Sequence, residues 1–544
     1  MGKGIVKLGE GNWAVKDGNL LAAKETNSRF KNAEFTVTRG TDATYVGKDG
    51  LVKTASFYNL FSYSEDFENQ WTAQSGITIT NNTTETTSPS GGYNAAKVVS
   101  TDSTRGFSKT GMSITANATR TIYLKGSVGG ESVTLKDGSG HGGAETYSLT
   151  TDWVRYELKT TADGNTYQGL FVDNISVGTI YAWGAQIVEG TEALDYQYTN
   201  GKEGIPRIDF TDNTDGHLLL EPESTNLIPY SEDFEQWTSS NLTPTSGQSS
   251  AITSSNDAWL FTATAILANV TLSVSSSGAN TLSVFAKAGT QDGIFIRFSG
   301  SSNPRAAFNL SNGTLIGSGG GVTSSNVEAF NDGWYRISIT GTDNVTDARI
   351  YVADSTGNFV SSGNIYVQNA QLEALPYPTS YIPTNGGQVT RDAEIVQRES
   401  IDEIDIPQEE GTIYLELKEY KQNTEIFNFD RSTSNSIHVG TDSNGVLKVW
   451  GYYEPSGTGT SVQVTLSANT SKVAIAFKNG SFIVYADGEE ELNTSTFVWT
   501  PTDSIDRLYF NRGGYVASQG LSKVKALRIY KEAFNTTQLD ELTS

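Results

Sequence analysis

The sequence predicts an all-β protein of tandem β-sandwiches, in which two related copies are followed by one distinct jelly roll, with very little helix. Short runs alternate between apolar and polar residues and end at Gly, Asn, Asp or Ser, as at 120–126, 280–286 and 411–418. This period of two is typical of half-buried strands. Helical periodicity is nearly absent until the segment after Asn535, where a polar cap predicts one short helix.

An internal repeat defines the first two sandwiches. The segment 59–68 (NLFSYSEDFE) recurs as 226–235 (NLIPYSEDFE), and Trp71 and Trp237 follow at almost the same offset. The separation between matching segments grows from 167 to 185 residues along the repeat, so the second copy carries about eighteen extra residues, which we expect in loops. A repeat of this length indicates a duplicated structural unit.

The remaining segments differ from the repeat in character. Residues 1–34 lack a sandwich pattern and hold six Lys or Arg against four Asp or Glu. The predicted order is a separate segment at 1–34, a small β connector at 35–58 plus 201–225, sandwich copy 1 at 59–200 as an inserted duplicate, sandwich copy 2 at 226–394, an acidic linker at 395–410 and the jelly roll at 411–544.

Composition excludes several functional classes. The chain holds 61 Asp+Glu against 38 Lys+Arg, and a net charge of −23 opposes binding to nucleic acid. It has no cysteine, which removes disulfides and thiolate chemistry, and no apolar run approaches the ~18 residues of a membrane span. The first residues lack the apolar core of a signal peptide, so we expect the protein either to act where it is made or to leave the cell by a route other than secretion.

Several segments resemble those of tailed-bacteriophage head fibre, spike and tail fibre proteins, where they accompany a carbohydrate-binding-module-like sandwich that opens with YSEDF. They are 35–51 (FTVTRGTDATYVGKDGL), 205–210 (IPRIDF), 218–227 (LLLEPESTNL), 379–384 (TSYIPT) and 389–394 (VTRDAE). Here copy 1 separates the first segment from the second. We therefore expect the parts near 35–56 and 205–225 to lie together in space.

The C-terminal unit resembles concanavalin-like jelly rolls of the laminin-G and pentraxin type, through 411–416 (GTIYLE), 485–488 (YADG) and 524–530 (VKALRIY). Together these resemblances imply a structural virion appendage that adsorbs host-surface or environmental glycans. The alternative is a purely architectural decoration or adaptor protein that binds other virion proteins. The resemblance further implies a homo-oligomer, a trimer in fibres of this kind, on the virion surface after synthesis in the host cytoplasm and release by lysis.

No catalytic motif stands out, and we expect no enzymatic activity. Glycosidases need two carboxylates held about 5–10 Å apart on a cleft. The acidic runs at 402–405 and 489–491 are typical of solvated surface charge, and the chain lacks the nucleophile elbow, the zinc-binding helix motif and the phosphate-binding loop.

Aromatic side chains are the candidate glycan ligands, because their rings stack on the apolar faces of sugars. Trp450, Tyr452 and Tyr453 precede a glycine-rich segment, and strict alternation places the first two on one face and Tyr453 on the other. The competing interpretation puts Trp450 in the core. Trp183 is a further surface candidate, because copy 2 has Gln368 at the matching position and a site that accepts both residues is expected to be exposed.

Two smaller groups complete the candidates. No cofactor is expected, but Asp209, Asp212 and Asp215 form an acidic cluster that is a candidate Ca²⁺ site, with an ordinary Asx-rich turn as the competing interpretation. Trp13 and Phe30 are the candidate virion-anchoring residues of the slightly basic N-terminal segment.

Overall fold

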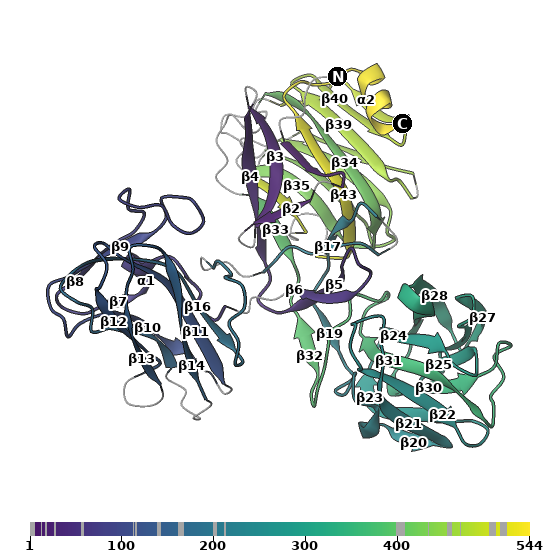
Figure 1. The fold of residues 1–544 in the computed structure, drawn as a ribbon. Coiled ribbons are helices and arrows are strands. Elements are labelled where there is room, and N and C mark those ends of the chain that lie inside the picture. The colour runs from purple at the N-terminus through teal and green to yellow at the C-terminus, as the bar shows by residue number, and fades with distance from the viewer. Residues whose placement is uncertain are drawn as a thin grey trace. The chain divides into compact units, whose positions relative to one another are not determined.

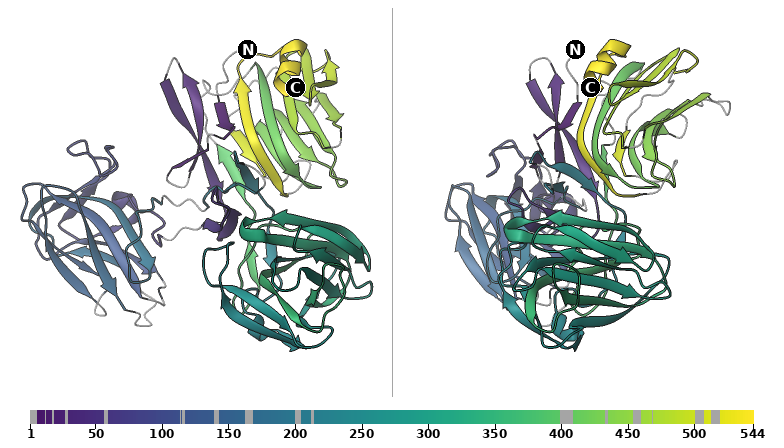
Figure 2. Two further views of the ribbon diagram at one scale, coloured as in Figure 1. Left: turned by 45° about the vertical axis from the view of Figure 1, so that its right-hand side comes forward. Right: turned by 90° about the vertical axis from the view of Figure 1, so that its right-hand side faces the viewer.

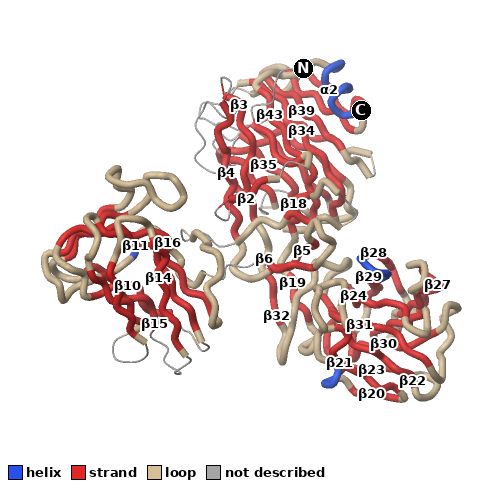
Figure 3. The backbone as a smooth tube through the Cα atoms, in the orientation of Figure 1, coloured by secondary structure: helices blue, strands red, loops and turns tan. Residues whose placement is uncertain are grey.

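The computed structural model divides the chain into two compact units, Met1–Ala55 with Gly204–Ser544, and Ser56–Glu203. Strands dominate both units and helices are short (Figure 3). The residues that the structure describes are 6–11, 13–16, 19–26, 29–55, 59–112, 114, 117–138, 143–161, 168–199, 204–211, 214–398, 409–432, 435–453, 460–467, 469–499, 507–511 and 519–544. Within these ranges, no helix is long and apolar enough to cross a membrane.

Unit Ser56–Glu203 is a sandwich of two antiparallel sheets whose inward side chains share one core. Alternating burial, as in β8 (Ile77–Thr80), confirms the period of two that the sequence shows. One sheet has the order β13 (Ala144–Ser148), β12 (Ser132–Lys136), β15 (Gln168–Asp173), β10 (Phe107–Met112) and β7 (Thr72–Ala73). The other has the order β14 (Val154–Thr160), β11 (Ala118–Gly126), β16 (Gly178–Glu189), β9 (Ala96–Ser100) and β8. The short helix α1 (Phe67–Gln70) begins at the capping side chain of Asp66.

The second sandwich belongs to the other unit and has the same plan with one more strand in each sheet. One sheet has the order β20 (Thr238–Ser240), β23 (Asn269–Ser276), β30 (Val345–Ala353), β25 (Gly293–Ser299), β26 (Arg305–Asn309) and β27 (Thr314–Gly319). The other has the order β21 (Leu242–Gln248), β22 (Ala258–Ala263), β31 (Gly363–Glu373), β24 (Ala279–Ala288), β29 (Trp334–Thr342) and β28 (Val322–Ala329). Single 3₁₀ turns lie at η1 (Phe234–Gln236) and η2 (Asn331–Gly333).

The extra residues of copy 2 are not in loops, contrary to the sequence-based expectation. They form β27 and β28, which lie at the edges of the two sheets. Their sequences are rich in Gly, Ser and Thr and carry few apolar residues, because an edge strand needs little apolar burial. A composition rich in Gly, Ser and Thr is also typical of loops, so the sequence does not distinguish these edge strands from loops.

The repeated residues have the same structural roles in both copies. The amide of Asn59 donates to the carbonyls of Ala185 at 3.1 Å and Gln197 at 2.8 Å, and Asn226 bonds two carbonyls in the same way, at 3.2 and 2.9 Å. Both asparagines are buried, and each Oδ1 also accepts from backbone N–H groups. The shared motif therefore fixes the fold of each sandwich.

The C-terminal residues form a jelly roll whose two sheets pack around one large core. One sheet contains β41 (Glu489–Thr494), β40 (Ser481–Ala486), β39 (Lys472–Lys478), β34 (Glu410–Tyr420) and β43 (Ser522–Tyr530), with β1 (Val6–Gly9), β2 (Ala14–Lys16), β3 (Asn19–Thr26), β17 (Ile208–Asp209) and β18 (His217–Leu220) beyond β43. The other has the order β38 (Thr460–Thr465), β37 (Leu447–Tyr453), β36 (Asn435–Thr441), β35 (Glu425–Ser432), β42 (Arg507–Phe510), β33 (Ile395–Arg398) and β4 (Arg29–Thr38). Helix α2 (Thr536–Thr543), with the expected cap at Asn535, packs on the outer face of the first sheet.

The described residues among 1–34 form strands of this jelly roll, although the sequence suggested a separate segment. Strand β1 pairs with β43, from Val6 opposite Ile529 to Gly9 opposite Ala526. Figure 2 shows the purple N-terminal strands beside the yellow C-terminal strand. Strand β4 pairs with β3 and with β33, so it joins the two sheets. Strands β1 and β4 thus pair with strands from distant parts of the chain, which a local pattern does not reveal.

A buried ion-pair network lies where the jelly roll meets the second sandwich. The small strands of this region, which Figure 1 labels, are β5 (Ala43–Val46), β6 (Val52–Ala55), β19 (Ser224–Asn226) and β32 (Val389–Arg391). Arg207 pairs with Glu394 and, at 2.8 Å, with Glu221, which also binds Arg391 at 2.8 Å, and Arg39 binds Glu394. All five side chains are nearly inaccessible to solvent. These five residues come from four of the five segments singled out in the sequence, and Ser380 of the fifth segment accepts a hydrogen bond from Arg207 at 2.7 Å.

Candidate functional site

The candidate glycan residues Trp450 and Tyr452 share one face of β37. Burial alternates along this strand, with Leu447, Val449 and Tyr453 turned to the buried side. Trp450 and Tyr452 are half-buried on the opposite side. The alternation of a strand explains this arrangement, as the sequence predicted.

Neighbouring strands extend this face into two rows, which we call the β37 face. In an antiparallel sheet, residues directly opposite each other point to the same side. The register gives a first row of Asn428, His438, Trp450 and Gln463 and a second row of Asp430, Ser436, Tyr452 and Ser461. Exposure rises across each row, from fully buried on β35 to exposed on β38.

The buried end of the β37 face holds hydrogen-bonding groups with spare capacity. Glu425 Oε1 accepts from Asn428 Nδ2 at 2.9 Å and lies 3.6 Å from His438 Nδ1, and His438 Nε2 lies 2.5 Å from Ser436 Oγ. Within the described part of the chain, Glu425 Oε2 and Asn428 Oδ1 have no partner although both side chains are fully buried. Buried polar atoms normally find partners, so these two acceptors can bind a donor that is absent from the chain.

The ring of Trp450 extends over a glycine in the adjacent strand. A Cβ atom at Gly440 would lie 3.6 Å from Trp450 Cζ3. Chemically, the β37 face combines two aromatic rings with hydroxyl, amide, imidazole and carboxylate groups. This combination suits a hydroxyl-rich ligand with an apolar face.

Tyr453, a candidate glycan ligand in the sequence, does not belong to this face. It is only 7% exposed and lies on the opposite side of β37. It therefore cannot touch a ligand that binds Trp450. Sequence reasoning also missed Glu425, Asn428 and His438, because polar residues in a strand give no sign that they are buried.

Trp183 is buried as well, which corrects the expectation of a surface site. It is 6% exposed and packs against Tyr123 and Tyr196, with ring centroids 5.3 and 4.6 Å away. The counterpart Gln368 is only 1% exposed. An exchange of Trp for Gln suggests an exposed position, but the side chain at this position is buried in both copies.

The acidic cluster is only partly described, since Asp212 lies outside the described residues. Asp209 accepts from the backbone N–H of Val46 at 2.8 Å and of Thr211 at 3.0 Å and lies 3.3 Å from His217 Nε2. Burial favours a raised pKa for Asp209, but the contacts with His217 hold it well below its usual range. No group of three or more potential metal-binding side chains occurs among the described residues, and the calcium site stays a prediction.

The candidate anchoring residues have different outcomes. Trp13 is half-buried against the jelly-roll core, and its indole Nε1 donates to the carbonyl of Asp215 at 2.9 Å. The backbone of Phe30 lies in β4, but its side chain is outside the described part of the chain. A role of either residue in anchoring is not tested by these contacts.

No protein-family model and no curated protein matches the chain. Among solved structures, the tandem CBM22 domain of a Paenibacillus barcinonensis protein is 14% identical, with a TM-score of 0.20 over 58% of this chain and 98% of that one. A pentraxin from Limulus polyphemus is 17% identical, with a TM-score of 0.22 over 27% and 75%. A Trypanosoma rangeli sialidase is 8% identical, with a TM-score of 0.22 over 99% and 98%.

These similarities are weak and carry no functional argument. The all-β, tandem-sandwich class is confirmed by the sheets themselves. The phage part of the resemblance stays a prediction. The expectation that the chain is not an enzyme is withdrawn: the solved structures that align with almost the whole chain include a sialidase, and a TM-score of 0.22 establishes neither an activity nor its absence.

Proposed function

We propose that the protein is a head fibre, spike or tail fibre of a tailed phage that adsorbs glycans through the β37 face of its jelly roll. The observation that carries the glycan proposal is the pair of rows that cross four strands, with Trp450 and Tyr452 between buried polar groups and an exposed edge. A single face of this kind binds weakly, and several copies on one particle supply the strength.

The test is binding of the full chain to an array of bacterial and environmental polysaccharides. Trp450→Ala should lower the affinity by about tenfold or more, since it removes the ring that stacks on the sugar. Trp153→Ala is the matched control, because Trp153 is also half-buried but lies in copy 1, where its Nε1 donates to the carbonyl of Thr87 at 2.7 Å. Unchanged binding in Trp450→Ala would refute this site. Silence of the unmodified chain across the array would favour the purely architectural adaptor.

The virion part of the proposal is supported by the appendage-like segments, four of which supply the buried charged network, while Ser380 of the fifth hydrogen-bonds Arg207. It predicts that the chain is recovered by mass spectrometry from purified phage particles, on whose surface antibodies reach it, and that it is a homo-oligomer, with a trimer expected in light scattering. Absence from the particles would refute it. Contact with other virion proteins through Trp13 is best tested by substitution, because deletion of residues 1–34 would also remove β1 from its sheet.

A further inference from the structure

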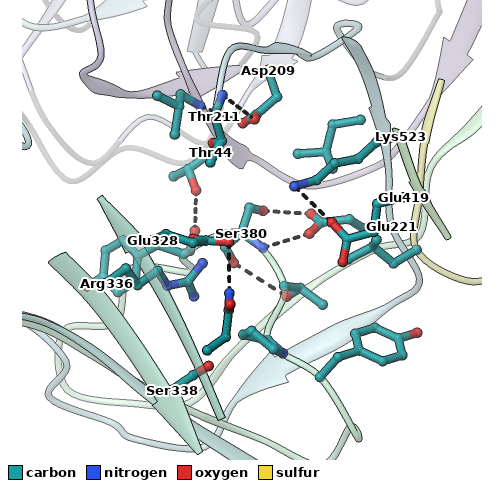
Figure 4. Close-up of a pocket in the computed structure, with 18 of the residues that line it drawn as sticks. Thr44, Asp209, Thr211, Glu221, Glu328, Arg336, Ser338, Ser380, Glu419 and Lys523 are labelled. Carbon is teal, nitrogen blue, oxygen red and sulfur yellow. Dashed lines mark hydrogen bonds and ion pairs between the residues drawn. The ribbon is translucent and has the colours of Figure 1, made fainter. Parts of the chain in front are cut away.

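A second candidate site is a cavity of about 250 Å³ inside the unit that contains the jelly roll. Strands β28 and β29 form one wall, the loop after β31 and the β5–β6 hairpin form others, and the ends of β34 and β43 close it. Figure 4 shows Glu328 and Arg336 on one side and the ion pair of Lys523 with Glu419 on the other. This cavity is separate from the β37 face.

The β28 wall presents three polar cross-strand pairs. Ser324 lies opposite Thr340, Asn326 opposite Ser338 and Glu328 opposite Arg336. Val327 and Ile337 point the other way and contribute to the sandwich core. The alternation of a strand therefore turns a full set of hydroxyl, amide, carboxylate and guanidinium groups into the cavity.

Arg336 is held with hydrogen-bonding capacity to spare. Its guanidinium lies 5.5 Å from the ring centre of Phe285, and its Nη2 donates to Ser283 Oγ at 3.1 Å. The side chain is 91% buried, but Nε has no partner among the described residues. Among the described residues, Glu328 accepts a single, long hydrogen bond, from Asn326 at 3.4 Å. Burial raises the pKa of Glu328, and Arg336 opposes that shift.

Charges of the two signs balance around the cavity. Glu221 is neutralised by Arg207 and Arg391. The other charged lining residues are three basic and three acidic ones, namely Arg336, Lys421, Lys523, Asp209, Glu328 and Glu419. A balanced lining favours neither a strong anion nor a metal ion. It suits a neutral ligand whose hydroxyl groups donate to carboxylates and accept from ammonium and guanidinium groups.

Copy 1 shows that the cavity depends on the added strand. There Arg155 lies 5.6 Å from the ring centre of Tyr123 and donates to Thr121 Oγ1 at 3.0 Å, which matches the setting of Arg336. In the described residues of copy 1, however, the sheet ends at β14, and no strand corresponds to β28. The extra residues of copy 2 thus supply Glu328 and its neighbours to an arginine that both copies contain.

The geometry points to one hexose-sized sugar unit as the ligand of this cavity. Its volume lies just below the range of about 300–1,000 Å³ for drug-sized ligands, which suits a single monosaccharide unit. Tyr45 and Tyr377 line the cavity and supply aromatic surface for the apolar face of the ring. This binding site does not depend on glycan adsorption at the β37 face.

The test is saturation-transfer-difference NMR of the full chain with glucose, galactose, mannose, rhamnose and N-acetylglucosamine. At least one sugar should bind, and Glu328→Gln and Arg336→Gln should each weaken its binding by about tenfold or more. Arg155→Gln is the matched control and should leave binding unchanged.

Thermal unfolding checks that each variant is folded. If Arg336→Gln is not folded, Asn326→Ala, at the exposed edge of the wall, takes its place as the milder variant. Absence of binding for all five sugars, or binding that survives both Glu328→Gln and Arg336→Gln, would overturn the inference. Trp450→Ala should leave monosaccharide binding intact. The polysaccharide array tests the β37 face and the NMR experiment tests the cavity, so either proposal can be refuted without the other.

Discussion

Arg207 and Glu394 are 187 residues apart in sequence, yet Arg207 Nε donates to Glu394 Oε1 at 2.7 Å in a site that solvent does not reach. Both residues also bind further charged partners, which are Glu221 for Arg207 and Arg39 for Glu394. A buried ion pair is costly to break from one side, because the remaining charge stays buried without compensation.

Replacement of Arg207 by Met should therefore destabilise the unit that contains the jelly roll by about 3–5 kcal/mol. Denaturant unfolding of the full chain should show this loss of stability as a lower denaturant concentration at the midpoint of that unit's transition. Lys53→Met is the control, since its pair with Asp49 is exposed and such pairs contribute at most about 1 kcal/mol. Equal effects of the two substitutions would contradict the role of the network.

The two buried asparagines give a paired prediction. Asn59→Ala and Asn226→Ala each leave buried backbone groups without partners, at a cost of about 1–3 kcal/mol for each group. Asn59→Ala should lower only the unfolding midpoint of the unit Ser56–Glu203. Asn226→Ala should lower only the unfolding midpoint of the other unit. Hydrogen exchange read by mass spectrometry locates the effect, and a shift of both units by one substitution would argue against independent folding.

Stability should also fall in acid because of Glu221. Burial favours a raised pKa, but Arg391 and Arg207 lower the pKa of Glu221 to about 2, from 4.5 in the unfolded chain. A carboxyl with a lowered pKa stabilises the fold above its unfolded pKa, and this contribution is lost as the pH falls from about 5 towards 2. Urea unfolding across this range should show the decline. Glu221→Gln should flatten it, and an unchanged slope in that variant would rule Glu221 out as its cause.

Excision of copy 1 is the fourth prediction. Arg39 Nη2 donates to the carbonyl of Ala55 at 2.7 Å, and Arg39 Nη1 donates to the carbonyl of Ile205 at 3.2 Å. The residues that flank the excised segment are thus bonded to one guanidinium and lie close together. Replacement of residues 56–203 by a short Gly/Ser linker should leave the remaining unit with an unchanged unfolding midpoint. A large loss of stability in the calorimeter would show that copy 1 supports that unit.

The sequence predicted the fold class because alternation and turn residues are local signals. It also indicated the shared face of Trp450 and Tyr452, since strand geometry alone sets it. The long-range partners were out of reach. Nothing local to Val6 or to Arg39 indicates pairing with Ile529 or Glu394, because those contacts depend on how distant strands meet.

The candidate sites were predicted less well for a related reason. Trp183 and Tyr453 are aromatic residues in strands, and exposure of such residues depends on what packs above the sheet. Glu328 and Arg336 were missed altogether. They lie in a polar edge strand and its neighbour, and their importance follows from the cavity that other segments enclose.

The position of Arg39 has an evolutionary consequence. The Arg39 side chain bonds Ala55 and Ile205, the residues on either side of copy 1. A module can therefore be gained, lost or exchanged between them without altering the described strand pairings of the host unit. Recombination at this single locus can therefore exchange one inserted module for another.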